Sequence, residues 1–524
     1  MKLFRHLFHM NKKSAPALAP APTPAPAPAP AQETADTVTI KSSLAENARY
    51  LDQAMFHTDD LVKLSLTYQN QALLLCYLDP MCDEVKIRSF ILKPLAESEE
   101  ENLADVFTAP RVYAQTSLDE AADTLLQGQA VLFKESSKEC YSITVNAEVK
   151  RTTEEPENEK TVRGSHEGFV ENMTVNLHLI RKQIKNRHLV IRRYTLGKES
   201  RTEVALAYLN HVAKPELILE IDKRLRTIAG ANTLSTDLME EYIEDRTLSP
   251  FPQILTTERP DRAAANLLEG RAVLISAGTP SALVMPVTFF SFYQSPDDYY
   301  SRTLAGSFIR FIRLLSFVIA ITLPAFYIAV ITFHYEVIPA ELLFQIKGSV
   351  EMVPYPPLLE AMFMELTLEL LREAGIRLPG PIGQTIGIVG GLVIGDAVVR
   401  VGLVSYPMII VVALTAISSF IVPSHEMSAS VRLLRFAVML PAALLGFIGI
   451  VFSLIFILIH LCKLESFGTP YLAPAAPFRL KDWKDTLFRF PLWKKDNRVN
   501  MAKPAVKKDN ADSKELQEND TQFE

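Results

Sequence analysis

The long apolar stretches of the C-terminal half constrain the fold more than any other feature of this chain. The segments 314–333, 401–424 and 436–459 contain no formally charged residue, and 378–395 is a fourth, shorter apolar stretch. A helix needs about 20 apolar residues to cross the hydrocarbon core of a bilayer. The sequence therefore predicts an α-helical multispan membrane domain over residues 306–462.

The residues before this domain are typical of a water-soluble protein. Residues 1–40 form a basic N-terminus followed by an Ala/Pro run at 15–31. Proline suits neither a helix interior nor a sheet ladder, so we expect this run to be an extended tether. The N-terminus lacks the apolar region of a secretory signal, and we therefore expect the soluble half to stay in the cytoplasm.

A weak internal repeat organises the soluble half. Two pairs of segments are similar: 124–133 with 266–275, and 73–79 with 204–210. The first pair is typical of a helix end, a glycine stop and a buried strand. We interpret the repeat as two related α/β subdomains, 41–150 and 185–305, joined by a linker and loop at 151–184. Chance similarity is the alternative. The predicted fold class is a multidomain membrane protein with two α/β cytoplasmic subdomains followed by the multispan helical domain.

Composition and motifs argue against several classes of function. The formal net charge of -6 gives no indication of nucleic-acid binding, and none of the four cysteines forms a CxxC pair. The pair His166-Glu167 lies between Gly164 and Gly168, and a glycine-turned loop explains it more simply than a metal or catalytic site. We predict no enzyme, no metal site and no cofactor.

Basic residues flank the apolar half. Residues 463–524 form a polar tail whose segment 479–508 is rich in Lys and Arg, so we expect it to be cytoplasmic. It either contacts anionic lipid or is a solvated tail that only sets topology. Arg302, Arg310 and Arg313 precede the first apolar stretch, and we expect them in the cytoplasmic headgroup layer.

Residues 354–375 carry an acidic row on a helix of membrane-spanning length. Glu365, Glu369 and Arg372 share one face at i, i+4 and i+7, and Glu360 points roughly opposite Glu369. Carboxylates facing lipid are costly. The row therefore lines a pore in a ring of subunits, where acidic rings favour cations, or lies on a surface helix with its carboxylates in water, or is neutralised internally by Arg372 and Arg377.

Two further features lie between this helix and the next apolar stretch. Asp396 and Arg400 are spaced i, i+4 and can pair on one helix, with a role in an ion path as the alternative. Gly387, Gly391 and Gly395 have GxxxG spacing, which favours close helix packing in lipid. A nucleotide loop is not supported, because no soluble strand–helix context surrounds these glycines.

The sides on which the two ends of the membrane domain lie constrain the number of membrane crossings. If the soluble half and the basic tail are both cytoplasmic, the number of full crossings is even. Four crossings, with 378–395 as a partial crossing, place Arg432 and Arg435 outside, which fits poorly. Six crossings, or a surface helix at 355–374, stay open.

Several motifs together resemble a known family. They are Glu167-Gly-Phe169, Glu244-Asp-Arg-Thr-Leu-Ser-Pro-Phe-Pro-Gln253, Glu258-Arg-Pro-Asp261, Leu267-Leu-Glu-Gly-Arg271, Asp298-Tyr-Tyr-Ser-Arg302, Leu323-Pro-Ala-Phe-Tyr-Ile328, Pro356-Pro-Leu-Leu-Glu360, Met364-Glu365, Glu369-Leu-Leu-Arg-Glu-Ala-Gly-Ile-Arg377 and Gly383-Gln-Thr-Ile-Gly-Ile-Val-Gly-Gly391. Over about residues 50 to 480 the chain resembles the A subunit of the GerA-type spore germination receptors of endospore-forming bacteria.

The resemblance implies a role in triggering germination, in the inner membrane of the spore. It implies a homo-oligomeric ring that releases cations in response to a nutrient. The expected partners are a transporter-like B subunit that recognises the nutrient and a lipoprotein C subunit. An accessory germination protein of the stage V sporulation AF type shares the same motifs and is the alternative. A secondary transporter is disfavoured, because no repeat is visible within 308–462.

Overall fold

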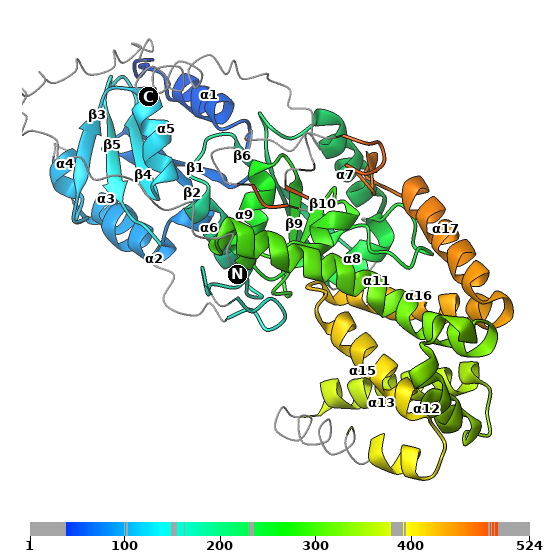
Figure 1. The fold of residues 1–524 in the computed structure, drawn as a ribbon. Helices are drawn as coiled ribbons and strands as arrows, with labels where there is room; N and C mark the ends of the chain where they lie inside the picture. Colours follow the sequence, from blue (N-terminus) through cyan, green and yellow to red (C-terminus); the bar gives the residue numbers. More distant parts are fainter. Residues whose placement is uncertain are drawn as a thin grey trace, which may run out of the picture. The chain divides into compact units, whose positions relative to one another are not determined.

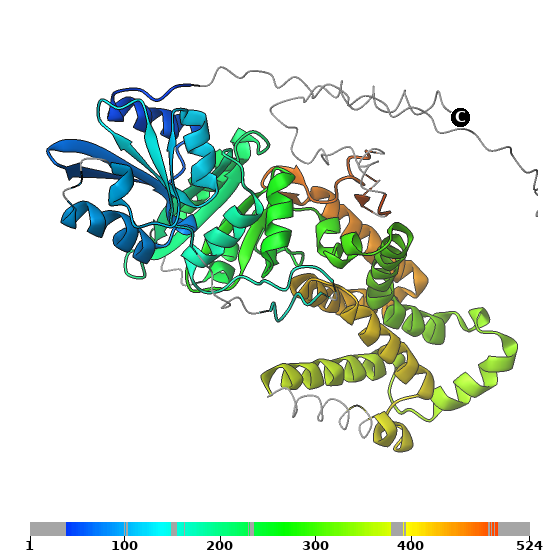
Figure 2. The same cartoon turned by 90° about the vertical axis from the view of Figure 1, so that its left-hand side faces the viewer.

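Two five-stranded antiparallel sheets precede a group of long helices in the computed structural model (Figures 1 and 2). The structure describes residues 38–98, 100, 103–147, 155–161, 163–228, 230, 235–378, 391, 395–479, 483, 485–486 and 488–490. The Ala/Pro tether, Gly387 and most of the basic tail lie outside these residues.

The first sheet has the strand order β1-β2-β4-β5-β3, with every pairing antiparallel. Its strands are β1 (Leu61–Tyr68), β2 (Gln71–Leu78), β3 (Val112–Gln115), β4 (Gln129–Lys134) and β5 (Cys140–Thr144). Its helices are α1 (Leu44–Ala54), α2 (Glu84–Ile87), α3 (Lys93–Glu97), α4 (Leu103–Val106) and α5 (Leu118–Leu126), with short turns η1 (Asp79–Met81) and η2 (Arg88–Leu92). Gln69 and Asn70 both have positive φ, as a two-residue hairpin turn between β1 and β2 requires.

The second sheet repeats this topology, with the order β6-β7-β9-β10-β8. Its strands are β6 (Leu189–Leu196), β7 (Thr202–Leu209), β8 (Leu255–Thr257), β9 (Ala272–Ser276) and β10 (Ala282–Met285). Its helices are α6 (Met173–Gln183), α7 (Pro215–Ile228), α8 (Thr236–Ile243) and α9 (Pro260–Leu268).

The segments paired by the sequence repeat occupy equivalent places in the two sheets. One pair covers the end of α5 with β4 and the end of α9 with β9, and the other lies on β2 and β7. Gly128 and Gly270 follow the two helices at positive φ, the conformation that a glycine stop needs. Helix α6 precedes β6 as α1 precedes β1, so the second repeat begins inside the segment that was expected to be linker and loop.

A buried ion pair connects the two repeats. Arg181 of α6 donates to the carboxylate of Asp60, just before β1, with Nε–Oδ2 and Nη2–Oδ1 distances of 2.9 and 2.8 Å. Both side chains are buried, and Thr58 accepts a further bond from the same guanidinium. Buried charges need this paired and hydrogen-bonded arrangement, so the contact fixes how α6 meets the first sheet.

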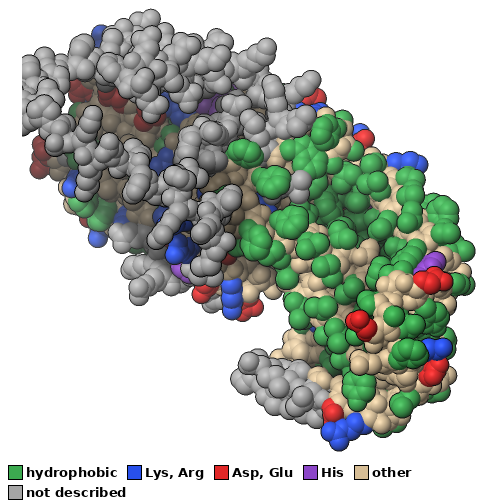
Figure 3. Space-filling view, viewed as in Figure 1, with side chains coloured by type: hydrophobic (Ala, Val, Ile, Leu, Met, Phe, Trp, Pro, Cys, Tyr) green, Lys and Arg blue, Asp and Glu red, His purple; other side chains and the backbone are tan. Residues whose placement is uncertain are grey.

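The C-terminal half is helical. Its elements are α10 (Asp297–Tyr300), α11 (Thr303–Phe333), α12 (Ala340–Glu351), α13 (Pro357–Arg377), α15 (Tyr406–Phe420), α16 (His425–Leu445) and α17 (Phe447–Lys463), with short turns η3 (Phe289–Tyr293) and η4 (Tyr335–Val337). Among the described residues, α11 and α16 are long and apolar enough to cross a membrane, and α15 and α17 are shorter apolar helices. Hydrophobic side chains cover much of the visible face over α11, α16 and α17 (Figure 3).

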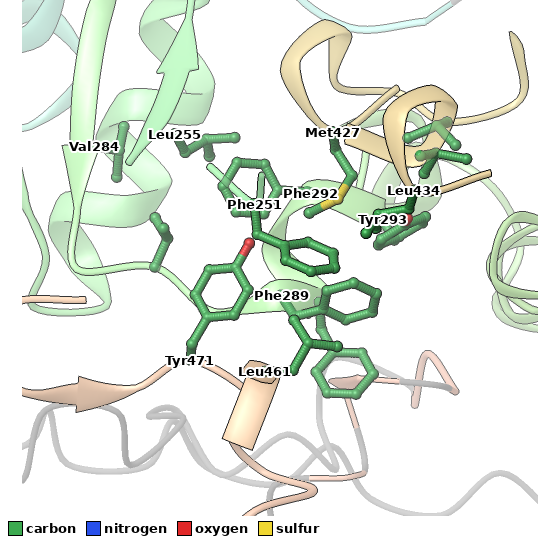
Figure 4. Close-up of a cluster of buried hydrophobic side chains, with 14 of the residues drawn as sticks. Phe251, Leu255, Val284, Phe289, Phe292, Tyr293, Met427, Leu434, Leu461 and Tyr471 are labelled. Carbon is green, nitrogen blue, oxygen red and sulfur yellow. The ribbon is translucent and has the colours of Figure 1, made fainter. Parts of the chain in front are cut away.

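The chain after α17 returns to the soluble half. It forms a small hairpin, β11 (Glu465–Ser466) and β12 (Thr469–Pro470), and then buries Tyr471 completely. The Tyr471 ring lies among Phe251, Phe289 and Phe292, with ring centroids 6.3 to 6.5 Å away (Figure 4). The chain therefore packs into the soluble half before it reaches the basic segment 479–508, for which lipid contact or a solvated tail was expected.

Arg310 and Arg313 do not lie on a surface that could face headgroups. Both are buried and bind the carboxylate of Asp298 in α10, at 3.0 Å for Arg310 and 2.7 Å for Arg313. Arg310 also pairs with Asp485 of the tail at 3.1 Å. The headgroup prediction fails for these two arginines because buried carboxylates nearby satisfy them.

Candidate functional site

The acidic row lies on α13, which packs against α11, α15 and α16. Pro357 is the first residue of the helix, where a missing N–H costs no hydrogen bond. The helix continues through Arg377. Its acidic residues can therefore be followed one turn at a time against the neighbouring helices.

Glu365 is paired at the most deeply buried level of this helix group. Its carboxylate binds the Nη1 group of Arg435 from α16, and the two side chains are 1% and 5% exposed. The Nε group of Arg435 donates to the carbonyl of Ala320 in α11 at 3.0 Å. Ala320 precedes Pro324 by four residues, and proline cannot donate to that carbonyl. Arg435 thus binds one oxygen of a buried carboxylate and a carbonyl that a proline leaves open, while Oε1 of Glu365 and Nη2 of Arg435 have no hydrogen-bond partner among the described residues.

The next two turns of α13 carry a second set of contacts. Glu369 pairs with the Nε group of Arg432 at 3.0 Å, and Arg432 also donates to Ser428 at 3.1 Å. Arg372 donates to Ser419 at 3.0 Å. The side chain of Glu369 is 40% exposed, so this pair is far more accessible than the one below it.

Glu360 is satisfied in a different way, at the start of α13. Its Oε1 atom accepts two hydrogen bonds of 2.6 Å, from the backbone N–H and the hydroxyl of Ser405. The Ser405 hydroxyl lies 2.9 Å from the hydroxyl of Tyr327 on α11. The Oε2 atom of Glu360 is buried, with no hydrogen-bond partner among the described residues.

The two carboxylates of the acidic row are paired within the chain, as one of the three predicted alternatives has it, but their partners are not Arg372 and Arg377. The carboxylates meet Arg432 and Arg435 of α16. Arg372 bonds a hydroxyl, and Arg377 pairs with the exposed Glu373 at 2.6 Å. Sequence reasoning missed these roles of the α16 arginines. The available signal was two charges in a helix that is otherwise apolar enough to cross a membrane.

The other predicted site residues lie apart from this set. Asp396 and Arg400 form the i, i+4 pair that their spacing predicts, at 2.8 Å, with both side chains exposed. A Cβ added to Gly391 or Gly395 would meet no described atom within 4 Å. These two glycines therefore make no close helix contact in the described part of the chain, and Gly387 lies outside it.

The outward face of α13 is apolar. Leu359, Phe363, Leu366 and Leu370 are each about half exposed or more. The helix thus buries Glu360 and Glu365 against its own chain and presents hydrocarbon on this face, which suits lipid or another protein surface.

The adjacent residues His166 and Glu167 do not form part of a metal-binding cluster in the described part of the chain. The Nδ1 atom of His166 lies 2.9 Å from the exposed carboxylate of Glu155. No group of three or more potential metal-ligating side chains occurs within the residues that the structure describes.

Comparison with known proteins gives consistent matches. The profile of a family described as Bacillus/Clostridium GerA spore germination protein matches residues 49–501. The uncharacterized membrane protein YfkQ of Bacillus subtilis (strain 168) is 38% identical over 462 residues, which is 87% of this chain and 90% of that protein. Spore germination protein KA of the same organism is 37% identical, covering 89% of this chain and 88% of its own length.

Two further matches come from other Bacillus species. Spore germination protein GerLA of Bacillus cereus is 38% identical over 79% of this chain and 86% of its own. Among solved structures, the N-terminal domain of the A subunit of the Bacillus megaterium spore germinant receptor GerK3 aligns with 48% of this chain and 98% of that chain. Its sequence identity is 25% and its TM-score is 0.38.

Proposed function

The chain belongs to the GerA family of spore germination proteins, and we propose that it is the A subunit of a nutrient germinant receptor in bacterial spores. Relatives at 37–38% identity over most of the chain are named as spore germination proteins. In this proposal the chain acts without enzymatic chemistry, together with receptor B and C subunits, in the inner membrane of the spore.

We place the helical half in the membrane with six crossings. Helices α11 and α16 have the necessary length and hydropathy. The tail makes hydrogen bonds with the soluble half: Ser466 donates to the Gln253 carbonyl, and Gln294 donates to the Asp485 carbonyl. The soluble half and the tail therefore lie on the same side of the membrane, which supports an even number of crossings. That side is the cytoplasmic one in our proposal.

The ends of the helices suggest the individual crossings. His334, after α11, stacks on Phe447 at the junction of α16 and α17, so these three helices share a far end. Glu360 meets Ser405 where α13 and α15 begin, and Arg372 meets Ser419 where α15 closes. The ends of both helices line one pocket with residues of the soluble half, so both run back toward it.

We further propose that copies of this chain form a ring that conducts cations when a partner signals. The observation that carries this proposal is the row of carboxylates on α13 held by arginines of α16. A displacement of α13 relative to α16 would release Glu369 first, because it is the more exposed partner, and would present negative charge to a central path. The paired and released states provide the two-state element that gating needs.

An accessory or scaffold role, of the stage V sporulation AF type, is the second candidate. It is favoured by the same ion pairs, because Glu365 is buried and neutralised within its own chain. A helix satisfied in this way needs no ring of copies around a pore.

Cation flux from liposomes that contain the purified full-length chain tests the proposal. The wild type is compared with Glu365→Gln/Glu369→Gln and with the single variant Glu369→Gln, which leaves the buried pair intact. Glu373→Gln is the matched control, since it removes an exposed carboxylate of the same helix. A conducting ring predicts that the first two variants lose flux or preference for cations over anions, while the control retains both.

The opposite results are equally informative. Wild-type flux that keeps its size and selectivity in both test variants contradicts an acidic path on α13. Absence of wild-type flux, from folded and oligomeric protein reconstituted with its B and C subunits, favours the scaffold role.

A further inference from the structure

A cavity lies where the cytoplasmic ends of α13, α15 and α16 meet a loop of the soluble half. Its volume is about 510 Å³, and its lining includes Lys160, Arg262, Arg372 and Arg432. His425 also lines it, while Glu159 is the single carboxylate among its lining residues in the described part of the chain. We call it the joint cavity.

Among the residues that the structure describes, the positive charges lining the joint cavity outnumber the negative charges that pair with them. Glu159 forms an ion pair with Arg262, and Arg432 forms an ion pair with Glu369. Lys160 and Arg372 form no ion pair with another residue that the structure describes. Counted over the described residues, the cavity therefore keeps two positive charges in excess, which favours an anionic occupant.

Arg372 is held in position for such an occupant. One Nη2 donor binds the hydroxyl of Ser419, and the guanidinium carbon lies 4.5 Å from the centroid of the Phe420 ring. A guanidinium has five N–H donors in a rigid fork, so most of its donors are left for a ligand. Phosphate oxygens match that fork closely.

The start of α16 adds to the same field. This 21-residue helix begins at His425, and both His425 and Ser428 line the cavity. The first turn of a helix carries a partial positive charge that attracts anions. Glu426, in the same turn, lines a different pocket beside Asp237 and Glu240. Two features thus converge on the joint cavity: the excess of cations, which includes the ordered Arg372, and the helix N-terminus.

We propose that the joint cavity binds a phosphate group. The source is either the headgroup of an anionic phospholipid or free inorganic phosphate. The apolar side chains Ile376, Phe420 and Val422 also line the cavity, and acyl chains could continue along them. Only the lipid source rests on the proposed membrane location; binding of phosphate itself does not.

The test uses the full-length chain in neutral detergent micelles and measures the midpoint of thermal unfolding. Phosphatidylglycerol, phosphatidylcholine and sodium phosphate are titrated separately at matched ionic strength. A ligand that binds the folded state raises the midpoint as its concentration increases. We expect phosphatidylglycerol or phosphate, but not phosphatidylcholine, to raise it for the wild type.

Arg372→Gln and Lys160→Gln identify the site. Loss of one charge-assisted hydrogen bond corresponds to about tenfold weaker binding, so both titrations should shift by about that factor. Lys160 is exposed on a loop, so its variant keeps the test valid if Arg372→Gln does not fold. Arg377→Gln, on the same helix but outside the cavity lining, should bind like the wild type.

The outcomes separate the possibilities. A shift produced by phosphatidylglycerol alone assigns a lipid headgroup, and a shift that phosphate reproduces and competes for assigns the free anion. The proposal is overturned if neither raises the wild-type midpoint above the phosphatidylcholine value, or if both cavity variants bind normally. Because no ion flux is measured, failure of the proposed channel leaves these results unaffected.

Discussion

Arg435 connects three helices through two of its guanidinium nitrogens. It binds Glu365 of α13 and the Ala320 carbonyl of α11, and it is itself buried. Removing one partner of a buried ion pair leaves the other charge without compensation, whereas replacing both by apolar groups is often neutral. The pair therefore matters more for how the helices meet than for net stability.

Arg435→Met should lower the free energy of unfolding by about 3–5 kcal/mol, because Glu365 stays buried without its counter-charge. The double variant Arg435→Met/Glu365→Met should recover most of that loss. Chemical denaturation of the full chain in detergent measures both. As a control, Arg400→Met breaks an exposed pair and should cost less than about 1 kcal/mol. Equal destabilisation by the single and double variants would contradict the pairing.

Glu240 of α8 gives the chain a residue-level dependence on pH. Burial raises its pKa above the ordinary value of 4.5, and the negative charges of Glu426, Glu244 and Asp237 raise it further. The unfolded chain releases this proton above about pH 4.5, while the folded chain keeps it, so rising pH favours unfolding. The stabilising contribution is thus complete below that pH and is lost as pH rises toward the folded pKa.

Glu240→Gln should therefore flatten the fall in stability between about pH 5 and pH 8 and leave the variant more stable than the wild type at the upper end. Thermal unfolding across this range measures the effect. Glu241→Gln changes the exposed neighbouring carboxylate and should retain the wild-type slope. An unchanged slope in Glu240→Gln would show that this carboxyl is ionised in the folded chain.

At the scale of elements, α10 and α11 are joined by one buried carboxylate. Asp298 accepts bonds from both Arg310 and Arg313, and the three side chains are buried. The same arginines stand one helical turn apart, so Asp298 binds both and holds the base of α11, with Asp485 as a second partner of Arg310.

Asp298→Asn should destabilise the chain by about 3 kcal/mol, since it leaves two buried guanidinium groups with less negative charge. It should also expose the start of α11 to limited proteolysis. Asp297→Asn is the control. Asp297 is the residue of α10 just before Asp298, and its backbone carbonyl, which the substitution keeps, accepts a hydrogen bond from the Ser301 hydroxyl. Similar proteolysis of the two variants would place the anchor elsewhere.

Local sequence patterns anticipated some of these elements and not others. The strands of the repeat were visible because an apolar run after a glycine stop is a local signal. Helix α6 was missed although Met173, Leu177 and Ile180 recur at helical spacing behind the cap residue Asn172, because the surrounding polar residues suggested a loop. The two arginines in an otherwise apolar α16 signalled that partners exist, but their pairing with Glu365 and Glu369 could not be predicted, since they stand about 60 to 70 residues further along the chain and depend on tertiary packing.

At the scale of the whole molecule, the aromatic cluster around Tyr471 joins segments from three regions of the sequence. Phe251 and Phe289 come from the soluble half, Met427 and Leu434 from α16, and Tyr471 from the tail (Figure 4). Tyr471 is fully buried, and its hydroxyl has no hydrogen-bond partner among the described residues. The Tyr471 ring thus stabilises the folded cluster, while burying its hydroxyl without a hydrogen bond costs free energy.

Two substitutions at this position should have opposite effects. Tyr471→Ala should lower the free energy of unfolding by about 3–5 kcal/mol through the cavity that it leaves. Tyr471→Phe should be neutral or stabilising by up to about 1 kcal/mol, because it removes an unsatisfied buried hydroxyl. Denaturation of the two variants side by side measures the difference. A destabilising Tyr471→Phe would mean that the hydroxyl is bonded after all.

The position of Tyr471 in the chain has a consequence for biosynthesis. The ribosome makes this residue only after α17, so the aromatic cluster of the soluble half stays incomplete while the apolar helices are being synthesised. During that interval Phe251, Phe289 and Phe292 lack the ring that packs among them, and chaperones bind apolar side chains exposed in this way. A transcript truncated before this codon should therefore yield a product that the quality-control proteases of the cell recognise and remove.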